Sequence, residues 1–405
     1  MLRAADRAGN GALGPETRRP TVLGRHHPRL SKRAAAAVAT GTVVAGTVAG
    51  GFLSAPAASA AAVPKGFKAN SLTWTSAQRG WVLGAAPCRP GSARTCTVVA
   101  ATTDGGSRWS RVGTVPARIA PSGESGVTDI RFATRTTGWA FGPDLYRTTD
   151  GGQKWRSERL PGRDKQVLAL AAGSRDVYAV VSPCAVGTVP SCSKPLSLWR
   201  APVATTAWRK VSGLTLPANY AASVAAKGRS VYVIDPLLGG TGKTDRFYAS
   251  TNGTRFSTRP VPCASKQDIG LVQAVPTTAT HVDLLCAGNP GLSDAVKTVY
   301  RSTDTGRTVT SAGTTPANGI SSELAASRSG NLAVASASDG TFLYVNDTGK
   351  RAWTEAIADA GSGWNDLSYV SDTKAWVVDN PVNTDGTGQV LVSTDAGRQW
   401  KNVSL

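Results

Sequence analysis

One motif recurs along this chain and constrains its fold more than any other feature: an octet of the form Ser/Thr-x-Asp-x-Gly-x-x-Trp. Clean copies occupy residues 102–109, 148–155 and 393–400. A fourth copy at 302–309 keeps Asp304 and Gly306 but ends in Val309. Repetition of one short motif at long intervals is the signature of a repeat architecture.

Three weaker copies extend the series to seven. Residues 250–256 form a copy one residue shorter, with Asn252 in place of Asp and Phe256 in place of Trp. Residues 346–353 form a longer copy, and the copy that ends at Trp208 keeps only its aromatic residue. The closing positions of the seven copies lie 46, 53, 48, 53, 44 and 47 residues apart. This period indicates four-stranded units in a radial array.

The octet has a structural explanation, because each copy lies between two alternating, strand-like runs. Asp can accept hydrogen bonds from the backbone N–H groups of its own turn. Gly permits a backbone conformation that other residues resist, and Trp supplies apolar area beneath the hairpin. We therefore expect structural roles for Asp104, Gly106, Trp109, Asp150, Gly152, Trp155, Asp304, Gly306, Asp347, Gly349, Trp353, Asp395, Gly397 and Trp400.

A second signature lies between the octets. Short strand-like runs follow a polar turn in every repeat, such as Gly-Trp-Val-Leu at 80–83 and Gly-Trp-Ala-Phe at 138–141. Another run precedes that turn, as at 130–132 and 167–170. Each repeat then holds four strands, called A to D here. The sequence predicts an all-β fold, a seven-bladed β-propeller with four antiparallel strands per blade, over residues 63–405.

Residues 1–62 differ in composition from the rest. Residues 1–33 carry eight Lys and Arg, residues 34–53 are uncharged and modestly apolar, and small residues follow up to Ala60. This layout predicts a secretory signal peptide with a basic lead, cleaved after Ala60 or Ala62, and a secreted protein. The alternative is an uncleaved membrane tether. No other segment could span a membrane.

Six cysteines support export, since their spacing is ordered. Two pairs are eight residues apart, and the remaining two fall around the fifth repeat. Such proximity favours disulfides in an oxidising compartment over zinc, because the spacings are not Cys-x-x-Cys and His281 is the single histidine after residue 62. We predict the pairs Cys88–Cys96, Cys184–Cys192 and Cys263–Cys286, and neither a metal nor a cofactor.

Propeller topology divides the connections between two faces. The B–C loops and the D–A connections emerge on one face, and the A–B and octet turns emerge on the other. The first face carries all three predicted disulfides and the longest loops: 114–126, 235–246, 287–297 and 380–389. Long loops on a rigid scaffold are the usual place for binding, so we expect function on this loop-rich face.

The octets together with the Gly-Trp strands resemble the BNR/Asp-box repeat families, over essentially the whole chain after residue 62. Residues 127–155 are most similar to the photosystem II assembly and stability factor propellers. That resemblance implies seven blades, no catalysis and a role in holding other proteins. It implies a protein-binding scaffold without identifying this chain's partner.

Other Asp-box propellers are enzymes, and they supply an alternative. Resemblance to sialidases fails, because no Phe/Tyr-Arg-Ile-Pro segment is present and that family has six blades. Xyloglucan hydrolases use two carboxylates across a central cleft, and Asp-Ile-Gly at 268–270 is similar to a short segment of theirs. The candidate acids, all at the starts of A strands, are Asp129, Asp268, Glu323 and Asp366.

Charge gives a final constraint on partners. The chain has a formal net charge of +19. Residues 1–62 hold eight of its 45 basic and two of its 26 acidic residues, which leaves +13 on the rest. This excess favours anionic surfaces. We therefore expect a monomer that binds an extracellular protein or polysaccharide, one that is anionic for preference. Nucleic acid is not expected, because no basic stripe interleaved with aromatic residues is present.

Overall fold

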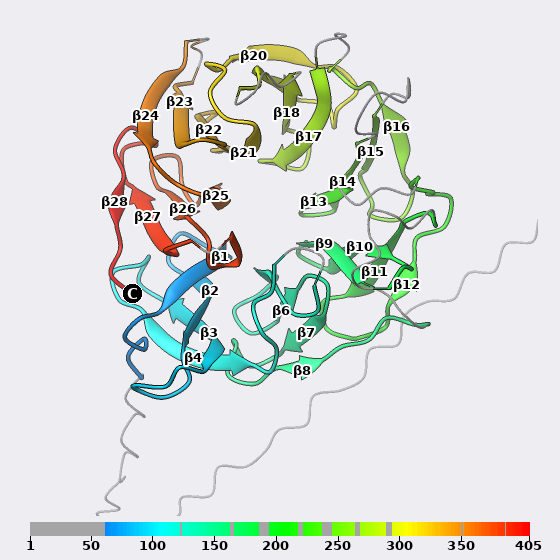
Figure 1. Cartoon of the computed structure of the whole chain (residues 1–405). Helices are drawn as coiled ribbons and strands as arrows, with labels where there is room; N and C mark the ends of the chain where they lie inside the picture. The colour runs from blue at the N-terminus through cyan, green and yellow to red at the C-terminus, as the bar shows by residue number, and fades with distance from the viewer. Residues whose placement is uncertain are drawn as a thin grey trace, which may run out of the picture. The chain divides into compact units, whose positions relative to one another are not determined.

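The computed structural model describes residues 61–121, 124–162, 166–185, 194–217, 222–236, 245–263, 268–288, 294–348, 350, 352–384 and 386–405. These residues form seven antiparallel sheets of four strands each, arranged in a ring (Figure 1). In every sheet the strands are paired in chain order. The predicted seven-bladed β-propeller is therefore confirmed.

The strands follow one another in groups of four. Blades 1 and 2 are β1 (Lys68–Trp74), β2 (Gly80–Pro87), β3 (Thr95–Thr102), β4 (Ser110–Val115), and β5 (Asp129–Phe132), β6 (Gly138–Phe141), β7 (Leu145–Thr148), β8 (Arg156–Ser157). Blades 3 and 4 are β9 (Gln166–Ala172), β10 (Asp176–Ser182), β11 (Ser197–Pro202), β12 (Arg209–Lys210), and β13 (Ser223–Lys227), β14 (Ser230–Asp235), β15 (Arg246–Ser250), β16 (Ser257–Arg259).

Blades 5 and 6 are β17 (Asp268–Pro276), β18 (Val282–Gly288), β19 (Lys297–Ser302), β20 (Thr310–Thr314), and β21 (Ser321–Ala326), β22 (Leu332–Ala337), β23 (Thr341–Asn346), β24 (Thr354–Asp359). Blade 7 is β25 (Trp364–Tyr369), β26 (Ala375–Asp379), β27 (Gln389–Ser393) and β28 (Lys401–Asn402), with a 3-10 helix, η1 (Val382–Thr384), between β26 and β27. No helix in the described ranges has the length and apolar character to cross a membrane.

The octets form one turn, repeated between the third and fourth strands. In the copy of blade 1, the Thr102 hydroxyl donates to Asp104 Oδ1 at 2.8 Å and accepts the Gly106 N–H at 2.9 Å. Asp104 Oδ1 also accepts the Arg108 N–H at 3.0 Å. The same three bonds recur around Asp150, Asp304 and Asp395. The carboxylate and hydroxyl therefore replace backbone partners that a turn this tight cannot supply.

Two of the weaker octets differ from each other in the hydrogen bonds of their turns. Asn252 keeps the pattern, since its Oδ1 accepts from the Ser250 hydroxyl at 3.1 Å and from the Arg255 N–H at 3.0 Å. Asp347 instead pairs with Lys350 at 2.9 Å and Arg398 at 2.5 Å. The longer copy has Val345 where five of the other copies have a hydroxyl, so the turn lacks the group that bridges Asp and Gly. Gly349 of this copy lies outside the described residues.

The second strands carry the largest buried side chains. Trp81, Trp139 and Trp376 are at most 1% exposed. Each lies between neighbouring blades: Trp81 stacks on Phe132 of blade 2 with ring centroids 3.8 Å apart, and Trp376 packs on Trp74 of blade 1 at 4.8 Å. The core is therefore a circle of interblade layers, which lets a chain of this length fold as one array.

The ring closes without exchange of strands, because blade 7 consists entirely of residues from 364 onward. Side chains hold the seam between blades 7 and 1. Asn70 in β1 accepts the Asn383 N–H at 2.7 Å, and its carbonyl accepts from Asn365 at 2.8 Å. On the other face, the octet glycine Gly106 fits directly against Trp376, where a Cβ atom would lie 2.3 Å from the ring.

Two predicted disulfides are present on the loop-rich face. Cys88 follows β2 and is bonded to Cys96 in β3, with Cα atoms 4.9 Å apart. Cys263 follows β16 and is bonded to Cys286 in β18, with Cα atoms 5.6 Å apart. Both lie at the ends of strands opposite to the octets. Cys192, the predicted partner of Cys184, lies outside the described residues.

Candidate functional site

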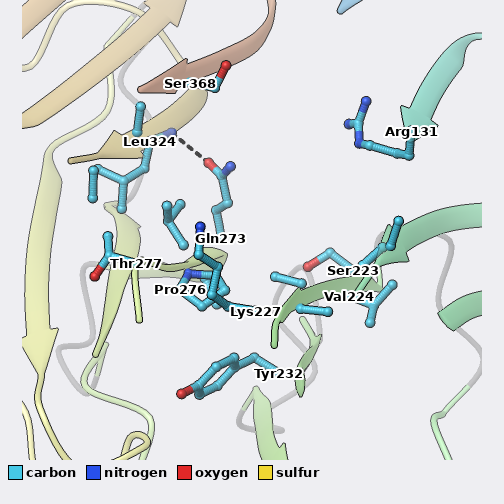
Figure 2. A pocket seen from close by; sticks show the side chains of 18 of the residues that line it. Arg131, Ser223, Val224, Lys227, Tyr232, Gln273, Pro276, Thr277, Leu324 and Ser368 are labelled. Carbon is cyan, nitrogen blue, oxygen red and sulfur yellow. Dashed lines mark hydrogen bonds between the residues drawn. The ribbon is translucent and has the colours of Figure 1, made fainter. Parts of the chain in front are cut away.

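The first strands of the blades surround a central cavity of about 1020 Å³. Alanine and other small side chains of β9, β13, β17 and β21 form much of its wall. Figure 2 shows Arg131 projecting into this cavity from β5, opposite Gln273 and Leu324. An adjoining cavity of about 430 Å³ contains Glu323 and Asp366 beside Arg131. Two carboxylates and a guanidinium therefore lie together at one part of the channel.

Arg131 organises these charges. Its Nη2 lies 2.6 Å from Asp366 Oδ1 and 3.7 Å from Asp129 Oδ1, so one guanidinium nitrogen bridges two carboxylates of different blades. Nη1 donates to the Ile130 carbonyl at 2.8 Å. Asp129 also accepts from the Thr128 hydroxyl at 2.6 Å. Asp129 and Arg131 are two residues apart on a strand, so both side chains face the channel.

A repeated hydrogen bond links the first strand of each blade to the next around much of the channel. The Gln273 side chain accepts the Leu324 N–H at 2.6 Å, and Glu323 accepts the Leu367 N–H at 2.9 Å. Asp366 accepts the Leu72 N–H at 2.8 Å, and Ser71 accepts the Ile130 N–H at 3.0 Å. In blade 4 the acceptor comes from elsewhere: Asp245, which directly precedes β15, accepts the Leu271 N–H of blade 5 at 2.5 Å. Glu323 and Asp366, two of the four candidate acids of the alternative hydrolase, therefore serve as interblade clamps.

Asp366 is the most heavily bonded of these clamps. Besides Leu72 and Arg131, it accepts the Ser71 hydroxyl at 2.5 Å. Its backbone has a φ of 59°, in the left-handed region that non-glycine residues rarely adopt. The pairing of β25 with β26 shifts register between Asn365 and Ser368, which places Asp366 in a β-bulge. The bulge redirects the side chain from its own blade toward blade 1.

Burial changes the acidity of this cluster. Burial, together with the nearby Asp366 charge, raises the pKa of Glu323 to about 7. Burial also raises the pKa of Asp129, although the Arg131 charge opposes the change. Glu323 therefore holds a proton in the folded protein at pH values where the unfolded chain has released it.

This shift predicts a pH dependence of stability. Because the folded pKa of Glu323 exceeds its ordinary value of 4.5, its contribution is fully present below pH 4.5 and is lost as pH rises toward 7. The Glu323→Gln variant keeps an oxygen for the Leu367 N–H and removes the titration. Urea unfolding of both proteins between pH 4.5 and 8 should show the variant gaining relative stability, at up to about 1.4 kcal/mol per pH unit.

The difference between the two proteins isolates Glu323. Burial also raises the pKa of Asp235 to about 7 and that of Asp379 to about 6. These two carboxyl groups therefore also make the free energy of unfolding depend on pH in the same range. Their effects are common to both proteins and cancel in the comparison. Parallel stability curves for wild type and variant would contradict the prediction.

Three of the four predicted acids, Asp129, Glu323 and Asp366, are brought to the channel. Asp268 begins β17, and its side chain lies outside the described part of the structure. Sequence reasoning missed Arg131, although the Asp-x-Arg spacing at 129–131 places both charges on one face of a strand. It also missed Asp245 and Gln273, whose roles depend on contacts between blades. Among the described residues, no three His, Cys, Asp or Glu side chains are grouped so that they could hold a metal ion.

Comparison with known proteins identifies the fold and leaves the family open. No protein-family model and no curated protein matches this chain. Among solved structures, an oligogalacturonate lyase in complex with manganese is 9% identical with a TM-score of 0.54, over 79% of this chain and 86% of that one. YCF48 bound to a D1 peptide is 17% identical with a TM-score of 0.43, over 70% and 82%. The GH74 xyloglucanase from Xanthomonas campestris is 12% identical with a TM-score of 0.37, over 84% and 73%.

Proposed function

We propose that this chain is an exported scaffold that binds an extracellular or cell-envelope protein or polysaccharide through its loop-rich face. The observation that carries the proposal is the use of the channel acids as clamps. Asp366 has both carboxylate oxygens engaged by blade 1 or Arg131, and Glu323 accepts a backbone N–H of blade 7. A general acid or a nucleophile needs a carboxylate that is free to meet substrate.

The loop-rich face is held in place from within, which suits a preformed binding surface. Lys297 is completely buried, and its Nζ donates to the carbonyls of Ala317, Asn318 and Gly319 at 2.5–3.3 Å. Burial lowers the pKa of this lysine to about 8. Asn70 likewise joins the Thr128 carbonyl and the Asn383 N–H, which belong to two different connections. The two disulfides brace further loops on this face and fit an oxidising compartment.

Val296 supplies a test of the face. It is the exposed large hydrophobic residue of the described structure, 47% exposed, and it lies in the loop between β18 and β19. We expect Val296→Glu to reduce capture of partners from a detergent-solubilised envelope extract by about tenfold, because an exposed apolar side chain at an interface contributes on the order of 1–2 kcal/mol. Affinity capture with quantitative mass spectrometry measures this loss.

The matched control is Thr303→Glu, an exposed position in the octet turn of the same blade. It adds the same charge on the opposite face and should leave capture unchanged. If the two variants behave alike, the loop-rich face is not the binding surface.

The alternative proposal is a glycoside hydrolase, and its specific support is the gathering of Asp129 and Asp366 around one guanidinium. Asp129 is the better probe because no backbone N–H of a neighbouring blade is bonded to it among the described contacts. Release of reducing ends from a polysaccharide panel, abolished by Asp129→Asn in a protein of unchanged stability, would establish the hydrolase and overturn the scaffold proposal.

A further inference from the structure

Positive charge is concentrated on the face that carries the octets. The described residues of the A–B and octet turns include twelve basic and six acidic side chains. The described residues of the longer B–C and D–A connections include five basic and six acidic ones. Among the described turns and loops, the excess of positive charge therefore lies on the octet face, opposite the loop-rich face.

The basic residues are spread around the whole ring, since each of the seven blades contributes at least one. Eight of them, in blades 1 to 6, are exposed and form no side-chain hydrogen bond or ion pair with a described residue: Arg108, Arg135, Lys154, Arg175, Arg229, Arg255, Arg307 and Arg328. Unpaired, hydrated basic side chains are available to an external anion. Paired ones such as Arg398 with Asp347 are already partly compensated.

The shape of this face restricts the partner. Its A–B turns are short, from the two residues between β13 and β14 to the five between β1 and β2. No large hydrophobic side chain of the described octet-face turns is exposed, because the one such residue, Val296, lies on the other face. A flat ring of cations without apolar anchors fits a flat anionic surface, to which it binds electrostatically and without insertion.

The point where the chain enters the propeller is on the same side. The Arg111 N–H donates to the Ala61 carbonyl at 2.8 Å, and Arg111 is the second residue of β4, immediately after the octet of blade 1. Ala61, the first residue that the structure describes, therefore lies at the octet end of blade 1.

We infer that the octet face docks on an anionic phospholipid surface and turns the loop-rich face outward. The propeller is then a platform with two functional sides. The octet face binds anionic lipid through charge alone, and the loop-rich face binds a specific partner. This assignment does not depend on which partner the loop-rich face binds.

The test uses the full chain with vesicles of phosphatidylcholine alone or mixed equally with phosphatidylglycerol. The octet-face variant carries Arg135, Arg175, Arg229 and Arg255 all changed to Gln. The control variant changes Arg89, Arg94, Lys194 and Arg246, all exposed near the loop-rich face, to Gln. Each charge near an anionic bilayer contributes about fivefold to affinity, so the octet-face variant should lose at least about tenfold in cosedimentation and the control much less. Binding should weaken as salt is raised.

Hydrogen exchange gives an orientation that is independent of any contribution from residues 1–60. Anionic vesicles should protect amides of the A–B and octet turns and leave those of the B–C loops unchanged. Equal losses in the two variants, or protection confined to the B–C loops, would overturn the inference. Binding to dextran sulfate without binding to vesicles would show that the octet face recognises a soluble polyanion and would overturn the lipid assignment.

Discussion

Replacing Asp366 by alanine is expected to lower the free energy of unfolding by about 3 kcal/mol, the largest effect of any single charge in the channel. The change leaves Arg131 without its 2.6 Å partner and leaves the Leu72 N–H without an acceptor. The Asp366 side chain is 8% exposed and that of Arg131 is 29% exposed, so water replaces these contacts only in part. Urea unfolding followed by tryptophan fluorescence measures the loss.

Two further variants show which contacts of Asp366 cause the loss of stability. Asp366→Asn keeps an oxygen for Leu72 and Ser71 but removes the charge, so it should fall between wild type and Asp366→Ala. Asp176→Ala breaks a more exposed ion pair with Arg200 at 3.8 Å and should cost less than about 1 kcal/mol. If Asp366→Ala lowers the free energy of unfolding no more than Asp176→Ala does, the contacts of Asp366 with blade 1 and Arg131 do not stabilise the fold as proposed.

The Gly106→Ala variant is expected to cost about 3 kcal/mol or more, for two reasons that add. Gly106 has a φ of 89°, where a side chain adds about 1–2 kcal/mol of strain. The new Cβ would also lie 2.3 Å from the Trp376 ring, and overpacking a filled core costs about 1–3 kcal/mol. Trp376 is itself packed on Trp74 and Trp109, so it has little room to move.

Gly213→Ala separates the two terms. Gly213 has a similar φ of 73°, and a Cβ there would meet nothing within 4 Å. This variant should show the backbone strain alone, about 1 kcal/mol. The difference between the two variants in the free energy of unfolding, measured in urea, gives the cost of the clash with Trp376. Equal losses in the two variants would mean that Trp376 moves aside to accommodate the new Cβ atom.

The blades were predictable because their turns are made by local chemistry. Thr102, Asp104 and Gly106 bond to one another within five residues, so the pattern is visible in the sequence and gives the repeat number. The copy at 346–353 shows the limit of the pattern. Aspartate alone suggests the turn there, but Val345 cannot supply the hydroxyl, and Asp347 pairs with lysine and arginine instead.

The channel could be predicted only in outline. Placing Asp129, Glu323 and Asp366 at the starts of first strands was sufficient to bring them to one channel. Their roles depend on a bulge at Asp366 and on Arg131 reaching across to blade 7, and neither has a local signal. The distribution of charge was hidden for a related reason. The net charge of the chain is evident from its composition. The face on which that charge lies becomes known only when each charged residue is assigned to a turn.

The absence of strand exchange at the seam has a consequence for how such a gene can vary. Because every blade is one uninterrupted piece of chain, no blade is the obligatory first one. New ends could be opened at another connection between blades and the old ones joined, and the circle would contain the same set of sheets. Duplication or loss of a whole blade would likewise cut no sheet in two, so the number of blades is open to change during evolution in a way that an interlocked ring would resist.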